Sequence, residues 1–168
     1  VGPVLRPDLY PGSGAPDDVE AARAQEYALL AALLLRAPDA ALLNRIGDLR
    51  GDATAPGIAH IELAAAARES TVEKIEREFF EVFIGIGRGE LLPYGSYYLT
   101  GFLHERPLAR LRQDMSEIGI DRAEGIVEPE DHAGILCEIM SGLVSGQLPA
   151  AVGSDRIIFE KHMTPWIG

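Results

Sequence analysis

The chain has 168 residues, of which 47% are hydrophobic, and its 15 basic and 26 acidic side chains give a formal net charge of −11. This length and apolar content predict one packed domain and exclude a chain that is disordered throughout. The acidity argues against nucleic acid as the main partner, because phosphate binding needs a positive surface. A basic peptide would suit this charge, and acidity that serves only solubility explains it equally well.

Three sequence features favour a cytoplasmic protein. The single cysteine, Cys137, allows no internal disulfide, which suits a reducing compartment. The apolar run from Tyr27 to Leu35 is far shorter than the ~20 residues that span a bilayer. No signal peptide is recognisable at the N-terminus. We therefore expect no stable membrane insertion.

The predicted elements are all helical. Residues 1–16 are rich in proline and glycine and are expected to form a mobile arm, followed by one helical domain over 17–168. Apolar periodicity and capping signals predict helices over 17–36, 38–46, 56–68, 70–84, 107–118, 129–143 and 155–163, with a further helical stretch from about Ser96. No segment alternates as a strand would, so the predicted fold class is all-α.

Two helix starts and one helix end carry specific expectations. Ser70 is the expected N-cap of a capping box, in which Glu73 reaches back to the backbone. Pro129 is expected in the first turn of a helix whose apolar face includes His132. Pro165 is expected to close the last helix.

The segment from Glu128 to His132 is the sharpest local feature, with three carboxylates around one histidine. The pattern alone favours a structural role, in which Asp131 fixes a partly buried His132, because acid-rich first turns are common. Cys137 lies five residues after His132, so the two side chains do not share a helix face well, and a buried structural thiol is favoured over a nucleophile.

Two groups of aromatic residues are candidates for recognition. Phe79 and Phe83 follow helical spacing with Val82, a pattern that more often marks a core than a binding surface. Tyr94 and Tyr97 are harder to explain as core, because buried tyrosines need hydroxyl partners. Tyrosine is also a favoured recognition residue, since it offers a large contact area at low entropic cost.

These residues together resemble the TorD-type family of redox enzyme maturation chaperones, which includes TorD, DmsD and NarJ-like proteins. A Glu-Pro-x-Asp-His sequence at a helix start is a hallmark of this family, and its specified positions are Glu128, Pro129, Asp131 and His132. The second hallmark is an aromatic box followed by a proline and a serine near aromatics, matched by Phe79, Val82, Phe83, Pro93, Tyr94, Ser96 and Tyr97. The resemblance extends over roughly residues 22–166.

The resemblance implies an all-helical TorD-like chaperone that is not an enzyme. Such a protein binds the twin-arginine signal peptide and the apo form of a molybdenum- or tungsten-containing oxidoreductase, here with a formate dehydrogenase-like subunit as one candidate. It assists insertion of the molybdopterin cofactor and prevents premature export. The eleven residues that match the two hallmarks form the expected peptide and client site. No metal or cofactor of its own is expected, and an indirect association with molybdopterin or GTP stays open.

The end of the chain bears on the expected oligomeric state. The segment from Phe159 to Trp166 resembles the part of the family that precedes further aromatic helices, so the bundle is expected to lack its last helices. Apolar surface uncovered in this way would favour association. Both a monomer and a homodimer with exchanged elements are compatible with the sequence.

Two other functions stay open at this point. A helical enzyme, metal-dependent or acid–base, would use Asp131 and His132 and would show ligands converging on His132. A helical adaptor or oligomerisation module would bury its tyrosines completely and leave no groove. The chaperone interpretation predicts an apolar groove beside Tyr94 and Tyr97, with Asp131 at its edge.

Overall fold

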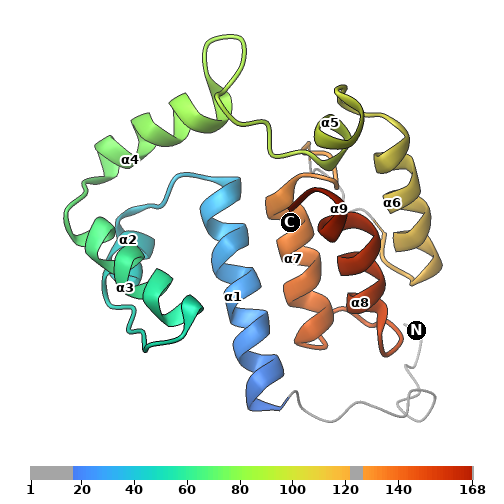
Figure 1. The fold of residues 1–168 in the computed structure, drawn as a ribbon, viewed down its shortest axis with the longest axis horizontal. Helices are drawn as coiled ribbons and strands as arrows, with labels where there is room; N and C mark the ends of the chain where they lie inside the picture. The colour runs from blue at the N-terminus through green and yellow to red at the C-terminus, as the bar shows by residue number, and fades with distance from the viewer. Residues whose placement is uncertain (1–16, 122–126, 168) are drawn as a thin grey trace, which may run out of the picture. The chain divides into compact units, whose positions relative to one another are not determined.

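A computed structural model describes residues 17–121 and 127–167 of the chain. All regular structure in these residues is helical, as predicted (Figure 1). The expected N-terminal arm, residues 1–16, lies outside the described residues. The described residues divide into two compact units, one of residues 17–31, 93–121 and 127–167 and one of residues 32–92, and each is described by itself. None of the described helices is long and apolar enough to cross a membrane.

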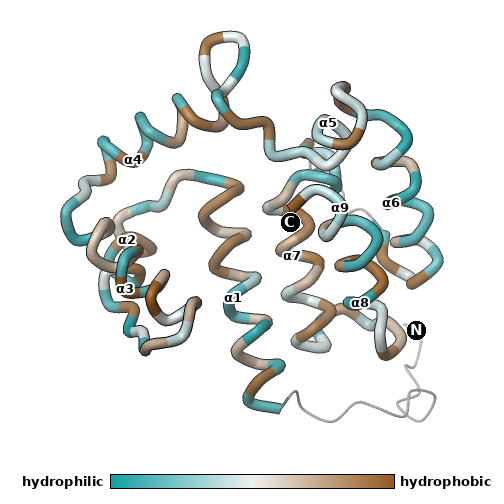
Figure 2. Tube along the Cα trace, in the orientation of Figure 1, coloured by the Kyte–Doolittle hydropathy of each residue, from teal (hydrophilic) through white to brown (hydrophobic). Residues whose placement is uncertain are grey.

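The larger unit is built around one buried helix. Its elements are α1 (Asp18–Leu35, up to residue 31), α5 (Gly95–Thr100), α6 (Arg106–Glu117), α7 (Ala133–Val144), α8 (Ser154–Ile158), the π-helical turn η3 (Phe159–Met163) and α9 (Thr164–Ile167). The side chains of Leu136 and Met140 on α7 are almost inaccessible to solvent. Much of α7 is hydrophobic, whereas α6 is mostly hydrophilic (Figure 2). The apolar residues of α7 thus form the centre of this core.

Neighbouring helices cover α7. Helix α7 contacts α8 and η3, while α5 contacts α6 and α9. Leu111 on α6 and Ile158 on α8 are buried at these contacts. A polar link joins α1 to α7, because the Ser141 hydroxyl donates to the carbonyl oxygen of Ala24 over 2.9 Å. An ion pair between Arg23 and Asp155 ties α1 to α8.

The smaller unit holds α2 (Ala40–Gly47), α3 (Ala55–Arg68), α4 (Val72–Phe79) and the π-helical turn η2 (Phe80–Ile84). Helices α2 and α3 pack on each other through buried Leu42, Ile46 and Ala64. The guanidinium of Arg68 donates to the carbonyl oxygen of Gly47 over 3.1 Å, which satisfies a helix-terminal acceptor.

The expected capping box at Ser70 is wrong by one residue. Thr71 is the N-cap of α4, and its hydroxyl accepts a hydrogen bond from the amide of Lys74. The amide of Ser70 donates to the carbonyl oxygen of Ala67, so Ser70 closes the turn that follows α3. Glu73 therefore occupies the second helical position of α4 and does not complete the box.

Two predicted helix boundaries at prolines are wrong. The helix predicted over 38–46 begins at Ala40, so Pro38 precedes its N-cap Asp39. Pro165 does not end the last helix, because the chain continues through η3 into α9, where Pro165 is the second residue.

Helix α7 begins at Ala133, later than the predicted start at Pro129, and His132 is its N-cap rather than part of its apolar face. Backbone groups on either side of His132 are engaged elsewhere. The carbonyl oxygen of Asp131 accepts from Gly95, and the amide of Ala133 donates to Pro93. The amide of His132 donates to the carbonyl oxygen of Pro129 and closes a turn, while the tertiary bonds of Asp131 and Ala133 keep a helix from starting at Pro129, although the local sequence favours one.

Candidate functional site

The two hallmark segments of the larger unit lie side by side. The amide of Gly95 donates to the carbonyl oxygen of Asp131 over 2.9 Å, and the amide of Ala133 donates to that of Pro93 over 2.7 Å. These bonds form an isolated antiparallel bridge between Tyr94 and His132. Residues more than 30 positions apart in the sequence are thereby fixed against each other.

Asp131 is the buried centre of this arrangement. Its side chain is only 4% exposed, and Oδ2 accepts a hydrogen bond of 2.7 Å from the amide of Ser96. Ser96 is completely buried. The other carboxylate oxygen, Oδ1, has no hydrogen-bond partner among the described residues. Asp131 therefore positions the start of α5 and keeps one acceptor unused.

His132 also has a structural role, as the residue pattern favoured. It is 5% exposed, and its Nδ1 accepts a hydrogen bond of 3.0 Å from the amide of Gly134. Burial lowers the pKa of His132, while the nearby carboxylates of Glu128 and Asp131 oppose this shift. A neutral ring whose Nδ1 is an acceptor carries its proton on Nε2.

Tyr94 and Glu128 form the accessible part of the hallmark segments. The Tyr94 hydroxyl lies 3.2 and 3.3 Å from the two carboxylate oxygens of Glu128, and both side chains are half-buried. The Tyr94 ring meets His132 edge to face, with 5.0 Å between ring centroids. Burial, followed by the charge of Glu128, raises the pKa of Tyr94 to about 12, so its hydroxyl is a donor at neutral pH.

A half-buried carboxylate beside an aromatic ring can bind a cation. Guanidinium groups form short, charge-assisted hydrogen bonds with carboxylates and stack on aromatic rings. The Tyr94 hydroxyl already donates to Glu128, which fixes the carboxylate in place. The arrangement can therefore receive an arginine side chain without having to order the carboxylate first.

Eight of the eleven predicted site residues belong to the larger unit, where the structure brings them together, and three belong to the smaller unit. Pro93 is buried and Pro129 half-buried within the paired segments, and Tyr97 packs edge to face on Tyr98. Phe79, Val82 and Phe83 belong to the smaller unit. They are half-buried, and no residue of α4 or η2 is fully buried, so the aromatic box is not core in the ordinary sense.

The enzyme interpretation predicted ligands converging on His132. No group of three histidine, cysteine or acidic side chains among the described residues could hold a metal ion. Cys137 is buried, as predicted, and burial raises the pKa of its thiol to about 11. The adaptor interpretation predicted that the tyrosines are completely buried, and this is wrong. Tyr98 is 51% exposed, and Tyr94 and Tyr97 are half-buried.

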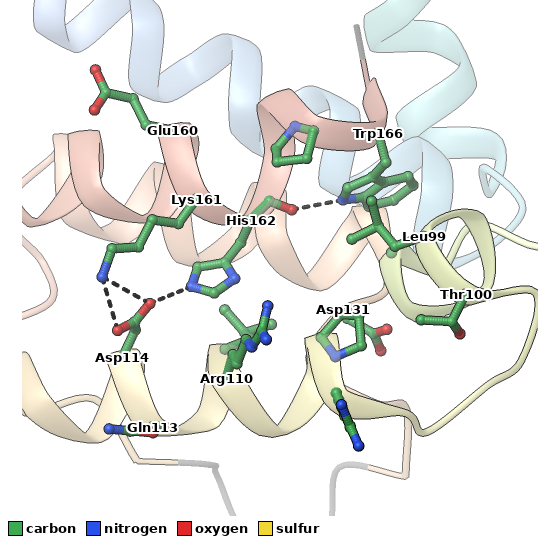
Figure 3. Close-up of a pocket in the computed structure, with 15 residues that line it drawn as sticks. Leu99, Thr100, Arg110, Gln113, Asp114, Asp131, Glu160, Lys161, His162 and Trp166 are labelled. Atoms are coloured by element: carbon green, nitrogen blue, oxygen red, sulfur yellow. Dashed lines mark hydrogen bonds and ion pairs between the residues drawn. The ribbon is translucent and has the colours of Figure 1, made fainter.

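A pocket of about 740 Å³ opens between α5, α6, η3 and α9 (Figure 3). Asp131 lies in its wall, but Tyr94 and Tyr97 do not line it, so it is not the apolar groove beside these tyrosines that the chaperone interpretation predicts. Sequence reasoning missed most of its lining, including Asp114, His162 and Trp166. A signal for Trp166 existed, since it is the only tryptophan of the chain and follows Pro165.

One polar cluster orders the pocket wall. The Nε2 atom of His162 lies 2.7 Å from Oδ2 of Asp114, and the Lys161 ammonium lies 3.1 Å from Oδ1. Burial alone would raise the pKa of Asp114, but hydrogen bonds from His162 and Lys161 hold it below its ordinary value. The indole of Trp166 donates to the carbonyl oxygen of His162 over 2.6 Å and stacks on Tyr98.

Comparisons with known proteins point to one family. Residues 51–168 match the model of the family described as nitrate reductase delta subunit. The chaperone protein TorD of Vibrio cholerae is 26% identical over 109 residues, which are 60% of this chain and 50% of that protein. TorD of Aliivibrio fischeri is 28% identical over 83 residues, or 48% of this chain and 39% of that protein. The chain thus spans about half the length of the first relative and less than half of the second.

The fold has a counterpart among solved structures. The crystal structure of a proposed redox enzyme maturation protein from Archaeoglobus fulgidus aligns with a TM-score of 0.54 and 23% identity, covering 86% of this chain and 79% of that one. At this identity the likeness speaks for the fold alone. The family match over residues 51–168 carries the assignment: the chain belongs to the nitrate reductase delta subunit family, the TorD- and NarJ-like maturation chaperones that its two motifs resemble.

Proposed function

We propose that this protein is a cytoplasmic chaperone for the maturation of a molybdenum- or tungsten-containing oxidoreductase. It binds the twin-arginine signal peptide and the apo form of that client, with a formate dehydrogenase-like catalytic subunit as the candidate. Membership of the family supports the general role, and the relatives named TorD are chaperones by name. The single observation that supports peptide binding is the fixed, half-buried Glu128 carboxylate beside Tyr94.

The accessible and the buried residues of the proposed site have different roles. Glu128 and Tyr94 would contact a guanidinium of the signal peptide. Asp131, His132 and Ser96 are buried and act by holding the two segments against each other. Substitution of a buried residue therefore tests the fold as much as binding, whereas Glu128 can be changed with little effect on the core.

The apolar face of α4 and η2 is a second proposed contact with the client. Phe79, Val82 and Phe83 are half-buried, and the rings of Phe79 and Phe83 lie 4.9 Å apart. An apolar stripe on a helix is the form of surface that takes up apolar residues of a partner. In this proposal it receives apolar residues of the client and works independently of Glu128.

No covalent step is needed for this function. A chaperone that binds the unfinished client more tightly than the finished one keeps it open for molybdopterin insertion and delays its export. Release follows when the loaded client loses affinity. In this proposal the cofactor belongs to the client, and the chaperone provides no ligand for it.

Isothermal titration with synthetic twin-arginine signal peptides tests the proposal. The peptides are those of molybdoenzymes encoded beside the gene, and each has a Lys-Lys counterpart. We expect binding that weakens with salt and with loss of the arginine pair. Glu128→Gln should weaken binding by roughly 5- to 30-fold, because a charge-assisted hydrogen bond is lost.

Glu138→Gln is the matched control. Glu138 is an exposed acid on α7 in the same unit, so this variant changes the net charge equally without touching the site. Affinity that falls by the same factor in both variants would show that only overall charge matters. Equal binding of the twin-arginine and Lys-Lys peptides would also refute the site.

A further inference from the structure

The pocket beneath Trp166 has the size of a binding site but no role in the contacts proposed above. Its volume of about 740 Å³ lies within the range of roughly 300–1,000 Å³ that is typical of ligand sites. Leu99, Pro107, Pro165 and Trp166 provide apolar walls. Figure 3 shows Trp166 and His162 facing Arg110 and Asp131 across the opening.

Several charges of the pocket wall are already neutralised within the protein. Lys161 and His162 both pair with Asp114. Glu160 pairs with Arg156 at 2.7 Å. These side chains therefore contribute little net charge to a ligand.

Two guanidinium groups of the pocket have no such partner. Arg106 and Arg110 are exposed and line the pocket, and neither forms an ion pair with any described residue. They lie one helical turn apart on α6, which is roughly 6 Å along the axis. In a chain with a net charge of −11, this is a local positive face. It suits carboxylates, which arginine binds in a bidentate manner.

The pocket also holds an unused acceptor. Asp131 lines it, is 4% exposed, and keeps Oδ1 without a partner among the described residues. A buried carboxylate oxygen without a hydrogen bond is costly, so a donor supplied by a ligand would be favourable. A simple anion offers no donor, whereas a peptide segment offers backbone amides.

Exposed apolar side chains continue from the pocket along α5 and the residues that follow it. Tyr98 on α5 and Phe102 and Leu103 after it are all exposed, at 51%, 70% and 41%. Leu99 of the same helix lines the pocket itself. The occupant that satisfies these features together has amide donors, apolar side chains and carboxylates.

We propose that this pocket docks an acidic, apolar segment of the client polypeptide. Carboxylates of the segment pair with Arg106 and Arg110, a backbone amide donates to Asp131, and an apolar side chain packs on Trp166. This inference rests on the proposed function, since it takes the client as the partner. It is a separate contact from the one at Glu128, because it selects the opposite charge.

The single tryptophan makes the test direct, because Trp166 lines this pocket and is the chain's one source of tryptophan emission. The probes are a 12-residue acetylated peptide that combines leucine with glutamate, and the same peptide with lysine in place of glutamate. We expect the acidic peptide to change Trp166 emission saturably and the basic peptide to leave it unchanged. The Arg106→Gln/Arg110→Gln variant should bind the acidic peptide about 10-fold or more weakly.

The control variant is Arg45→Gln/Arg50→Gln, which removes two exposed arginines that do not line the pocket. Its affinity for the acidic peptide should equal that of the unmodified protein. Equal losses in both double variants, or equal binding of both peptides, would overturn the inference. Displacement of the acidic peptide by inorganic pyrophosphate at similar concentration would also overturn it, since the pocket would then be a general oxyanion site.

Failure of this inference is distinguishable from failure of the proposed function. The same protein is titrated separately with the twin-arginine peptide. Binding of that peptide without binding of the acidic one overturns only the pocket assignment. Binding of the acidic peptide alone supports the pocket and removes the twin-arginine proposal.

Discussion

The contact between Gly95 and Trp166 yields a quantitative prediction. A Cβ atom at Gly95 would lie 2.9 Å from Nε1 and 3.1 Å from Cε2 of Trp166, which is closer than ordinary van der Waals contact. The indole is rigid and is held by its bond to His162 and its stack on Tyr98, so it cannot rotate away freely. Gly95→Ala should therefore act as an overpacking substitution, which costs about 1–3 kcal/mol.

Helix propensity opposes this cost and reduces the net loss in the free energy of unfolding. Alanine is favoured over glycine in a helix by up to about 1 kcal/mol, and Gly95 is the first residue of α5. We expect a net loss of about 1–2 kcal/mol in the free energy of unfolding. Urea unfolding followed by circular dichroism measures this loss, and Trp166 emission should shift because the indole is displaced.

The same substitution should change sign when the indole is removed. In a Trp166→Ala background the clash is absent, so Gly95→Ala should be neutral or stabilising through its helix propensity. The two substitutions would then be non-additive by at least about 1 kcal/mol. Equal destabilisation by Gly95→Ala in both backgrounds would refute this account of the contact between α5 and α9.

Three further predictions concern buried groups. Asp131→Ala should lower the free energy of unfolding by about 2 kcal/mol, because the Ser96 amide loses a charge-assisted bond, and Asp131→Asn should cost clearly less; equal losses in urea unfolding would contradict this. The free energy of unfolding should fall as pH drops below about 6.5. Burial lowers the pKa of His132 in the folded protein, so the unfolded chain binds the proton first, and His132→Asn should make the free energy of unfolding depend less on pH. Cys137 should react with a disulfide reagent at pH 8 at least about 100-fold more slowly in the folded than in the unfolded chain, because its thiol pKa rises from 9.0 to about 11; comparable rates would argue against its burial.

Local sequence patterns predicted the helices well where helix formation is a local matter. The helix predicted over 56–68 is observed as α3 (Ala55–Arg68), because its alanine-rich sequence and the Thr54 cap agree with each other. Gly119 adopts φ 79° just after α6, as expected of a residue that ends a helix. Such signals lie within a few residues of the element they define.

The errors arose where a distant segment decides the structure. The start of α7 was misplaced because Gly95 and Pro93 occupy backbone groups beside His132, and nothing near His132 in the sequence reveals this. The pocket was missed for the same reason, since Asp114 and His162 are 48 positions apart. The hallmark residues Glu128 and Asp131 were identified by resemblance, but only the contacts show that one is accessible and the other buried.

The proposed function requires that this chain bind an unfinished client more tightly than a finished one. The most direct measurement is its affinity for the molybdoenzyme encoded beside its gene, purified once without and once with the molybdopterin cofactor, both with the signal peptide intact. The account predicts tight binding of the apo form and binding weaker by about 10-fold or more for the loaded form. Equal affinity for the two forms would contradict a maturation chaperone, even with tight binding of the signal peptide alone.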